Sequence, residues 1–120
     1  MSAWFDFVWG RIGARALHLI FRVALLEVFG QREALKDRAV VIQGQVVKVN
    51  LDIMGRNWMH LRDGSGQGST GDLTFTTREK AEVGEVVVVR GTVRLDQDYG
   101  AGYRYPVIVE NAKLTRSPRR

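Results

Sequence analysis

The sequence predicts a mainly β fold, a five-stranded closed β-barrel preceded by an amphipathic α-helix. Five segments between residues 40 and 114 alternate apolar and polar side chains, and on a strand this alternation separates a buried face from an exposed one. Glycine-bearing turns separate the segments at regular spacing, as in small barrels. The first segment also changes its apolar phase near Gly44, which is typical of a strand that bends from one sheet into another.

The composition is that of one globular domain. The chain has 120 residues, of which 45% are hydrophobic and 26% charged, and this is enough to form a single core and argues against wholesale disorder. We expect a helical segment at residues 1–36, the barrel at 37–116 and a disordered basic tail at 117–120. The absence of cysteine excludes disulfides, thiolate zinc sites and cysteine nucleophiles.

Residues from Met1 to about Phe29 are predicted to form the helix. Four basic side chains lie on one narrow stripe of it, and the rest of its circumference is almost entirely apolar. The stripe consists of Arg11, Arg15, His18 and Arg22. These recurring bases disfavour a transmembrane span, and the segment lacks the basic start and unbroken apolar stretch of a secretory signal. The chain as it stands is therefore predicted to be cytoplasmic.

The wide apolar arc of this helix has three interpretations. The helix packs on its own barrel, pairs with a second copy, or lies in the plane of a membrane surface with its arginines at the headgroups. One small barrel covers only part of such an arc, and monomers rarely expose a large apolar patch. We therefore expect a homo-oligomer whose contacts include Trp4, Phe5, Trp9, Ile12, Leu17, Ile20 and Phe21.

A short helix and five strands are predicted to follow. The helix covers residues 27–37, with a break near Gly30 and with Phe29, Ala34 and Leu35 on its buried face. The strands cover residues 40–51, 58–63, 72–77, 85–95 and 105–114. In the first strand, Val40, Ile42 and Gly44 share one face, and Val47, Val49 and Leu51 share the other. In later strands the core side chains are expected to be Met59, Leu61, Leu73, Phe75, Val87, Val89, Val93 and Leu95.

Among five-stranded barrels the OB-fold is the natural candidate. An OB-fold usually binds its ligands across the second and third strands, between the loops that join strands 1–2 and 4–5. The expected nucleic-acid-binding residues on this surface are Lys48, Asn50, Arg56, Trp58, His60, Arg62, Tyr99, Tyr103 and Arg104. Aromatic rings stack on bases and cations contact phosphates. The alternative is that Trp58 and the tyrosines cover the barrel or seal it against the N-terminal helix.

Two long blocks of the sequence carry a family resemblance, IMGRNWMHLRDGSG at residues 53–66 and LDQDYGAGYRYPV at residues 95–107. With the strands around them, over about residues 27–116, they resemble a group of small bacterial OB-fold proteins described as nucleic-acid-binding or DNA-binding-like. The resemblance implies an OB-fold, and a binding function that rests on that fold. Members commonly begin with a signal peptide and are exported, whereas the first 26 residues here do not resemble a segment of the family.

No catalytic, metal or cofactor site is predicted. The two histidines, His18 and His60, are far apart and show no metal-ligand spacing. The loop GSGQGSTG lacks the Lys-Ser/Thr pair and the following helix of a phosphate-binding loop. We therefore expect a protein that is not an enzyme and has no small-molecule substrate.

The net charge of +5 is concentrated at the two ends of the chain. Residues 40–111 contain eight Lys/Arg and nine Asp/Glu, whereas residues 1–39 carry +2 and residues 112–120 carry +4. A near-neutral β region does not attract polyanions by its net field. Two functions remain open: a non-catalytic OB-fold module that binds single-stranded nucleic acid weakly, or an oligomerising interaction module whose helix contacts protein or a membrane surface.

Overall fold

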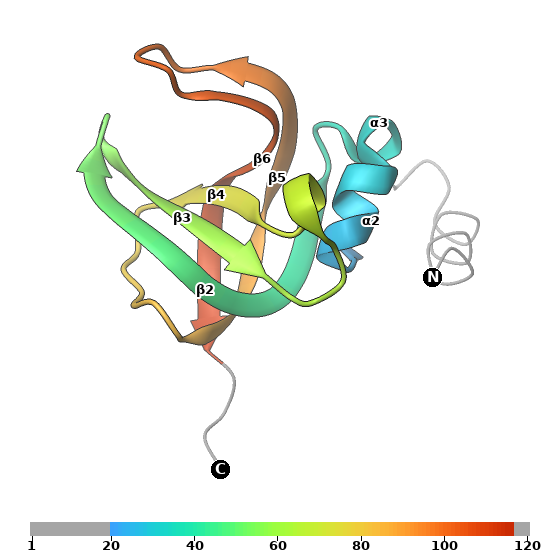
Figure 1. Ribbon diagram of the computed structural model, residues 1–120, viewed down its shortest axis with the longest axis horizontal. Helices are drawn as coiled ribbons and strands as arrows, with labels where there is room; N and C mark the ends of the chain where they lie inside the picture. The colour runs from blue at the N-terminus through green and yellow to red at the C-terminus, as the bar shows by residue number, and fades with distance from the viewer. Residues whose placement is uncertain (1–19, 117–120) are drawn as a thin grey trace.

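The computed structural model describes residues 20–116, which form a mixed six-stranded sheet with two short helices beside it (Figure 1). The strands are β1 (Ile20–Arg22), β2 (Ala39–Ile53), β3 (Arg56–Arg62), β4 (Leu73–Thr77), β5 (Val86–Asp98) and β6 (Arg104–Arg116). Their order is β1-β2-β3-β4-β6-β5, and β2 also pairs with β5. Strands β2 to β6 therefore pair around a ring. The five predicted strands are confirmed.

The core of the ring consists of the side chains that the alternation predicted. Met59 and Leu61 on β3, Leu73 and Phe75 on β4, and the four predicted β5 residues are all buried. They belong to one continuous apolar cluster. The predicted core faces of these three strands are confirmed, and on β5 burial repeats every second residue as pleated strands require. On β3 and β4 the opposite face is covered as well, since Trp58 and all five residues of β4 are buried.

Strand β2 bends at a β-bulge. Its register with β3 shifts between Val46 and Lys48, so the predicted change of phase is confirmed but its centre lies at Val47. Leu51 is 42% exposed, which corrects its expected place in the apolar set. Gly44 has a different role, since a Cβ atom there would lie 2.8 Å from the carbonyl oxygen of Arg62. Only glycine lets β2 approach β3 this closely.

The N-terminal part of the described chain corrects the predicted long helix. Residues 20–22 form β1, which runs parallel to residues 39–41 of β2. The pairing of β2 with β3 begins only at Gln45, so β1 occupies the edge of β2 that β3 does not reach. Phe21 is fully buried in this chain's own core, which removes it from the expected oligomer contacts. Residues 1–19 of the predicted helix and the basic tail at residues 117–120 lie outside the described residues.

Two short helices follow, α2 (Leu25–Gly30) and α3 (Arg32–Leu35). The predicted break near Gly30 is confirmed, because Gln31 has a non-helical backbone conformation. Leu35 is buried as expected. Ala34 is predicted on the same face but is exposed, since the core-facing side of the two helices consists of Leu25, Val28 and Leu35. None of the helices at residues 20–116 is long and apolar enough to cross a membrane.

The turn after β3 caps α2. The backbone amide of Leu25 donates to Asp63 Oδ2 at 2.7 Å, and the amide of Leu26 donates to Ser65 Oγ at 2.9 Å. Burial opposes ionisation of Asp63, but the hydrogen bonds from Leu25 and Ser65 lower its pKa overall. A carboxylate at a helix N-terminus satisfies amides that have no partner within the helix. The chain then forms a short 3-10 turn, η2 (Gly68–Thr70), before β4.

Candidate nucleic-acid interface

An aromatic cluster joins the two long hairpins of the ring. Trp58 on β3 meets Tyr99 edge-on at 5.1 Å between ring centroids, meets Tyr103 edge-on at 5.2 Å, and stacks on Tyr105 at 5.8 Å. Tyr99 and Tyr103 come from the tip of the β5–β6 hairpin, which Figure 1 shows extending on the same side of the ring as the tip of the β2–β3 hairpin. We call these four rings, together with Arg56, the aromatic interface.

Trp58 is the buried centre of this interface. Its side chain is 1% exposed, and its indole Nε1 donates to the carbonyl oxygen of Ile53 at 2.8 Å. This corrects the expectation that Trp58 presents an open aromatic face. The alternation along β3 does direct it away from the core, but the tyrosines of the other hairpin pack over it. The partly exposed rings of Tyr99, Tyr103 and Tyr105 form the outer layer of the interface.

Arg56 supplies positive charge beside these rings. Its guanidinium lies 5.7 Å from the centroid of the Trp58 ring and 5.3 Å from that of Tyr99, which is within the range of a cation–π interaction. Among residues 20–116, no carboxylate lies within ion-pair distance of Arg56. Its charge is therefore available to an anion that approaches the rings.

Hydrogen bonds and ion pairs fix the β5–β6 hairpin over Trp58. The Tyr99 hydroxyl donates to Glu110, which also lies 3.7 Å from Arg94 Nε. Burial, and then this hydrogen bond, raise the pKa of Tyr99 well above its ordinary value, and burial also raises the pKa of Tyr105. The tip is a tight turn closed by a 2.8 Å bond from the Tyr103 amide to the Gly100 carbonyl. With their pKa values raised, the phenols of Tyr99 and Tyr105 stay neutral at physiological pH.

A polar cluster continues the same face along β2 and β3. Lys48 pairs across the strands with His60, and Asn50 with Trp58. The Arg62 Nη2 atom lies 2.8 Å from Asp72, and His60 Nδ1 lies 3.7 Å from the other oxygen of that carboxylate. Burial lowers the pKa of His60, Lys48 adds to this effect, and Asp72 opposes it. Neutral His60 and paired Arg62 leave Lys48 as the free cation of this cluster within the described chain.

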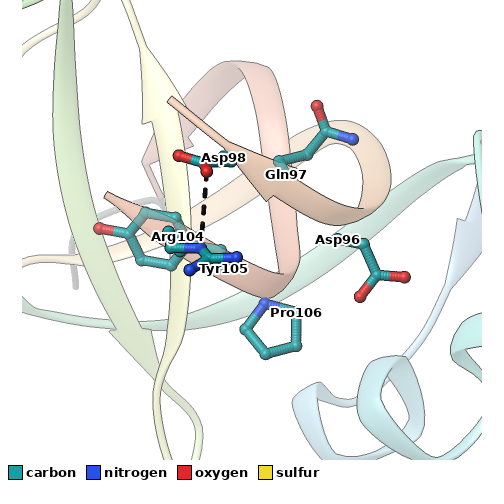
Figure 2. A pocket seen from close by; sticks show the side chains of 6 residues that line it. All are labelled: Asp96, Gln97, Asp98, Arg104, Tyr105 and Pro106. Carbon is teal, nitrogen blue, oxygen red and sulfur yellow. Dashed lines mark ion pairs between the residues drawn. The ribbon is translucent and has the colours of Figure 1, made fainter. Parts of the chain in front are cut away.

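Arg104 lies on the other side of the β5–β6 hairpin. It forms a 3.5 Å ion pair with Asp98 at the edge of a hollow of about 380 Å³ (Figure 2). Asp96, Gln97, Tyr105 and Pro106 complete the lining. Tyr105 therefore connects this hollow with the aromatic interface. The two aspartates make the hollow unfavourable for phosphate and suitable for hydrogen-bond donors. In the sequence, the signal for this hollow is the position of these aspartates next to the aromatic YGAGYRY stretch.

The nine predicted binding residues thus divide into three groups. Arg56, Trp58, Tyr99 and Tyr103 come together in the aromatic interface, Lys48, Asn50, His60 and Arg62 adjoin it on β2 and β3, and Arg104 lies beside the hollow. Their role in binding remains a prediction. Within residues 20–116, no group of three or more metal-ligating side chains is present.

Neither a protein-family model nor a curated protein sequence matches this chain. Solved structures with a similar fold include a DUF3299 family protein from Pseudomonas aeruginosa PAO1, with a TM-score of 0.52 and 15% identity, covering 72% of this chain and 66% of that one. A putative aspartyl-tRNA synthetase from Leishmania major Friedlin gives 0.53 at 16% identity, covering 99% and 27%. Asparaginyl-tRNA synthetase from Entamoeba histolytica gives 0.53 at 13%, covering 83% and 24%.

These similarities concern the fold alone. The chain spans about two thirds of the first of these proteins and about a quarter of each synthetase. The five-strand ring is OB-fold-like, with β4 and β6 parallel and the other ring pairs antiparallel.

Proposed function

We propose that this chain is a non-catalytic OB-fold binding module that holds single-stranded nucleic acid at the aromatic interface. The observation that carries the proposal is the position of Arg56 over the rings of Trp58 and Tyr99 with no carboxylate partner. Arg56 supplies a cation for the phosphate, and the partly exposed tyrosine rings around buried Trp58 supply a surface for the base, which are the two contacts that an unpaired nucleotide needs.

The outer tyrosines are the proposed stacking surfaces. Trp58 is buried and holds them in place, so the base contacts fall to Tyr103 and Tyr105, whose rings are half-buried. The neighbouring Lys48 supplies a second unpaired cation along the same face, next to His60. Among residues 20–116, only two free cations adjoin the rings, which supports weak binding in which stacking matters more than charge.

The test measures the anisotropy of a labelled oligothymidylate with the full chain and with Tyr103→Ala. Loss of one stacking ring is expected to weaken binding by about 1–3 kcal/mol, which is roughly 5- to 150-fold. Tyr103→Phe is the matched control, since it keeps the ring and removes only the hydroxyl. The proposal fails if the oligonucleotide does not bind at low salt, or if the alanine and phenylalanine variants bind equally well.

A second candidate function is a protein-interaction module. It is favoured by the apolar tip of the β2–β3 hairpin, where Leu51 is 42% and Met54 44% exposed. Such a tip suits a small apolar pocket on a partner protein. Leu51→Ser combined with Met54→Ser should leave oligonucleotide affinity unchanged if the tip has this separate role, and sedimentation velocity of the full chain would report whether a second copy is the partner.

A further inference from the structure

A row of basic side chains crosses the sheet toward the other end of β5 and β6 from the aromatic interface. Arg22 on β1 lies beside Val41 on β2, Val41 pairs with Arg90 on β5, and Arg90 pairs with Lys113 on β6. Each of the three basic residues follows a buried residue on its own strand and is itself exposed. Side chains of paired residues share a face, so all three point outward. We call them the basic row.

The charges of the basic row are not neutralised by the protein. Among residues 20–116, neither Arg22 nor Arg90 nor Lys113 has a carboxylate within 4.0 Å, whereas Arg94 on the same strand as Arg90 pairs with Asp37. The segments at 20–26, 39–51, 86–95 and 111–116 contain no Asp or Glu. Like charges directly opposite one another destabilise a strand pair, and a bound anion would relieve the repulsion between Arg90 and Lys113.

The dimensions of the row suit a line of phosphates. Neighbouring strands lie about 4.8 Å apart, so the row from β1 to β6 extends over roughly 14 Å. A nucleic-acid strand carries about one charge per 3.4 Å of helix axis, so several phosphates fit along this length. The paired residues on one side of the row are Gln43, Val88 and Thr115, and those on the other side are Ala39, Thr92 and Glu110, the last of which is held by Arg94 and Tyr99. None of the six is aromatic. The surface therefore offers charge without a ring on which a base can stack.

We propose that the basic row is a second nucleic-acid contact that binds the phosphate backbone whatever the bases and whether or not they are paired. This goes beyond the function proposed above, because the aromatic interface requires unpaired bases. Double-stranded DNA is therefore the probe that separates the two surfaces, since its stacked bases cannot enter the aromatic interface.

The experiment measures binding of the full chain to a labelled DNA duplex between about 50 and 200 mM salt. Each phosphate contact contributes about 0.9 to the slope of log K against log salt, so Arg90→Gln with Lys113→Gln should lower the slope by about 1.8. Over this salt range the full chain should lose roughly 12-fold more affinity than the variant. Tyr103→Ala should bind the duplex as the unmodified chain does, so failure of the aromatic interface leaves this result unaffected.

The matched control is Arg32→Gln with Lys36→Gln, which removes the same charge from exposed positions of α3 and its C-cap rather than from the sheet. Its slope should stay unchanged, and thermal unfolding of both variants establishes that they are folded. The proposal is overturned if the duplex does not bind at the lower salt, if both double variants lower the slope equally, or if the row variant changes binding only to phosphatidylserine vesicles. Loss of duplex binding only on deletion of residues 117–120 would also overturn it.

Discussion

The aromatic interface and the basic row use their cations in opposite ways. At the interface Arg56 lies over rings, and the arginines around it are paired with acids, Arg62 with Asp72 and Arg104 with Asp98. Within the described chain, no side chain of the basic row has a carboxylate within ion-pair distance. Two of its members, Arg22 and Lys113, lie outside the near-neutral segment at residues 40–111, and within that segment the free charge of Arg90 is offset by acids elsewhere. The two surfaces should therefore differ in what they require of a ligand: unpaired bases at one and phosphates alone at the other.

The largest expected effect concerns Trp58, and it tests whether this residue supports the interface or binds directly. Truncation of a large buried aromatic costs about 3–5 kcal/mol, so Trp58→Ala should lower the free energy of unfolding by this amount and abolish oligonucleotide binding. Chemical denaturation measures the first effect and anisotropy the second. Met54→Ala, at an exposed position on the same hairpin, is the control. Lost binding with a stability change below about 1 kcal/mol would identify Trp58 as a stacking surface itself.

A moderate effect of pH on stability is expected through His60, which lies beside the aromatic interface. The basic row contains no histidine. His60 ordinarily titrates at 6.5, and in the folded protein its pKa is lower. The unfolded chain therefore binds more protons than the folded chain just below pH 6.5, so stability should fall as the pH decreases through this window. Urea midpoints at about pH 7.5 and pH 5 measure the change. His60→Gln should reduce the dependence on pH, and an unchanged dependence would show that other groups cause it.

The smallest effect compares two arginines on the outward face of β5. Arg90 faces Lys113 directly, so Arg90→Gln should leave the free energy of unfolding unchanged or raise it by about 0.2–1 kcal/mol. Arg94 pairs with Asp37 and Glu110, so Arg94→Gln should lower stability by up to about 1 kcal/mol. The denaturation midpoint should thus fall for Arg94→Gln and stay the same or rise for Arg90→Gln. A loss of stability in Arg90→Gln would mean that its cation has an acidic partner in the folded chain.

Local pattern predicted the ring strands and their buried faces because each strand carries its own alternation of side chains. The same pattern misassigned residues 20–22, since an apolar segment is compatible with either helix or strand until the open edge of β2 is known. The pattern also predicted an exposed ring for Trp58, because burial of this ring depends on a hairpin about forty residues later in the chain. The basic row was not visible for the same reason, since its members come from three distant segments.

The capping of α2 by the turn after β3 makes the helix part of the cooperative unit of the ring. A helix of six residues is far below the length of about 12–15 residues at which isolated helices become even marginally stable. Its first amides depend on Asp63 and Ser65, which are in place only when β3 has formed. Local opening of α2 therefore requires the turn to open as well. Hydrogen exchange at Leu25 and Leu26 accordingly reports on the integrity of the sheet rather than on fraying of a helix end.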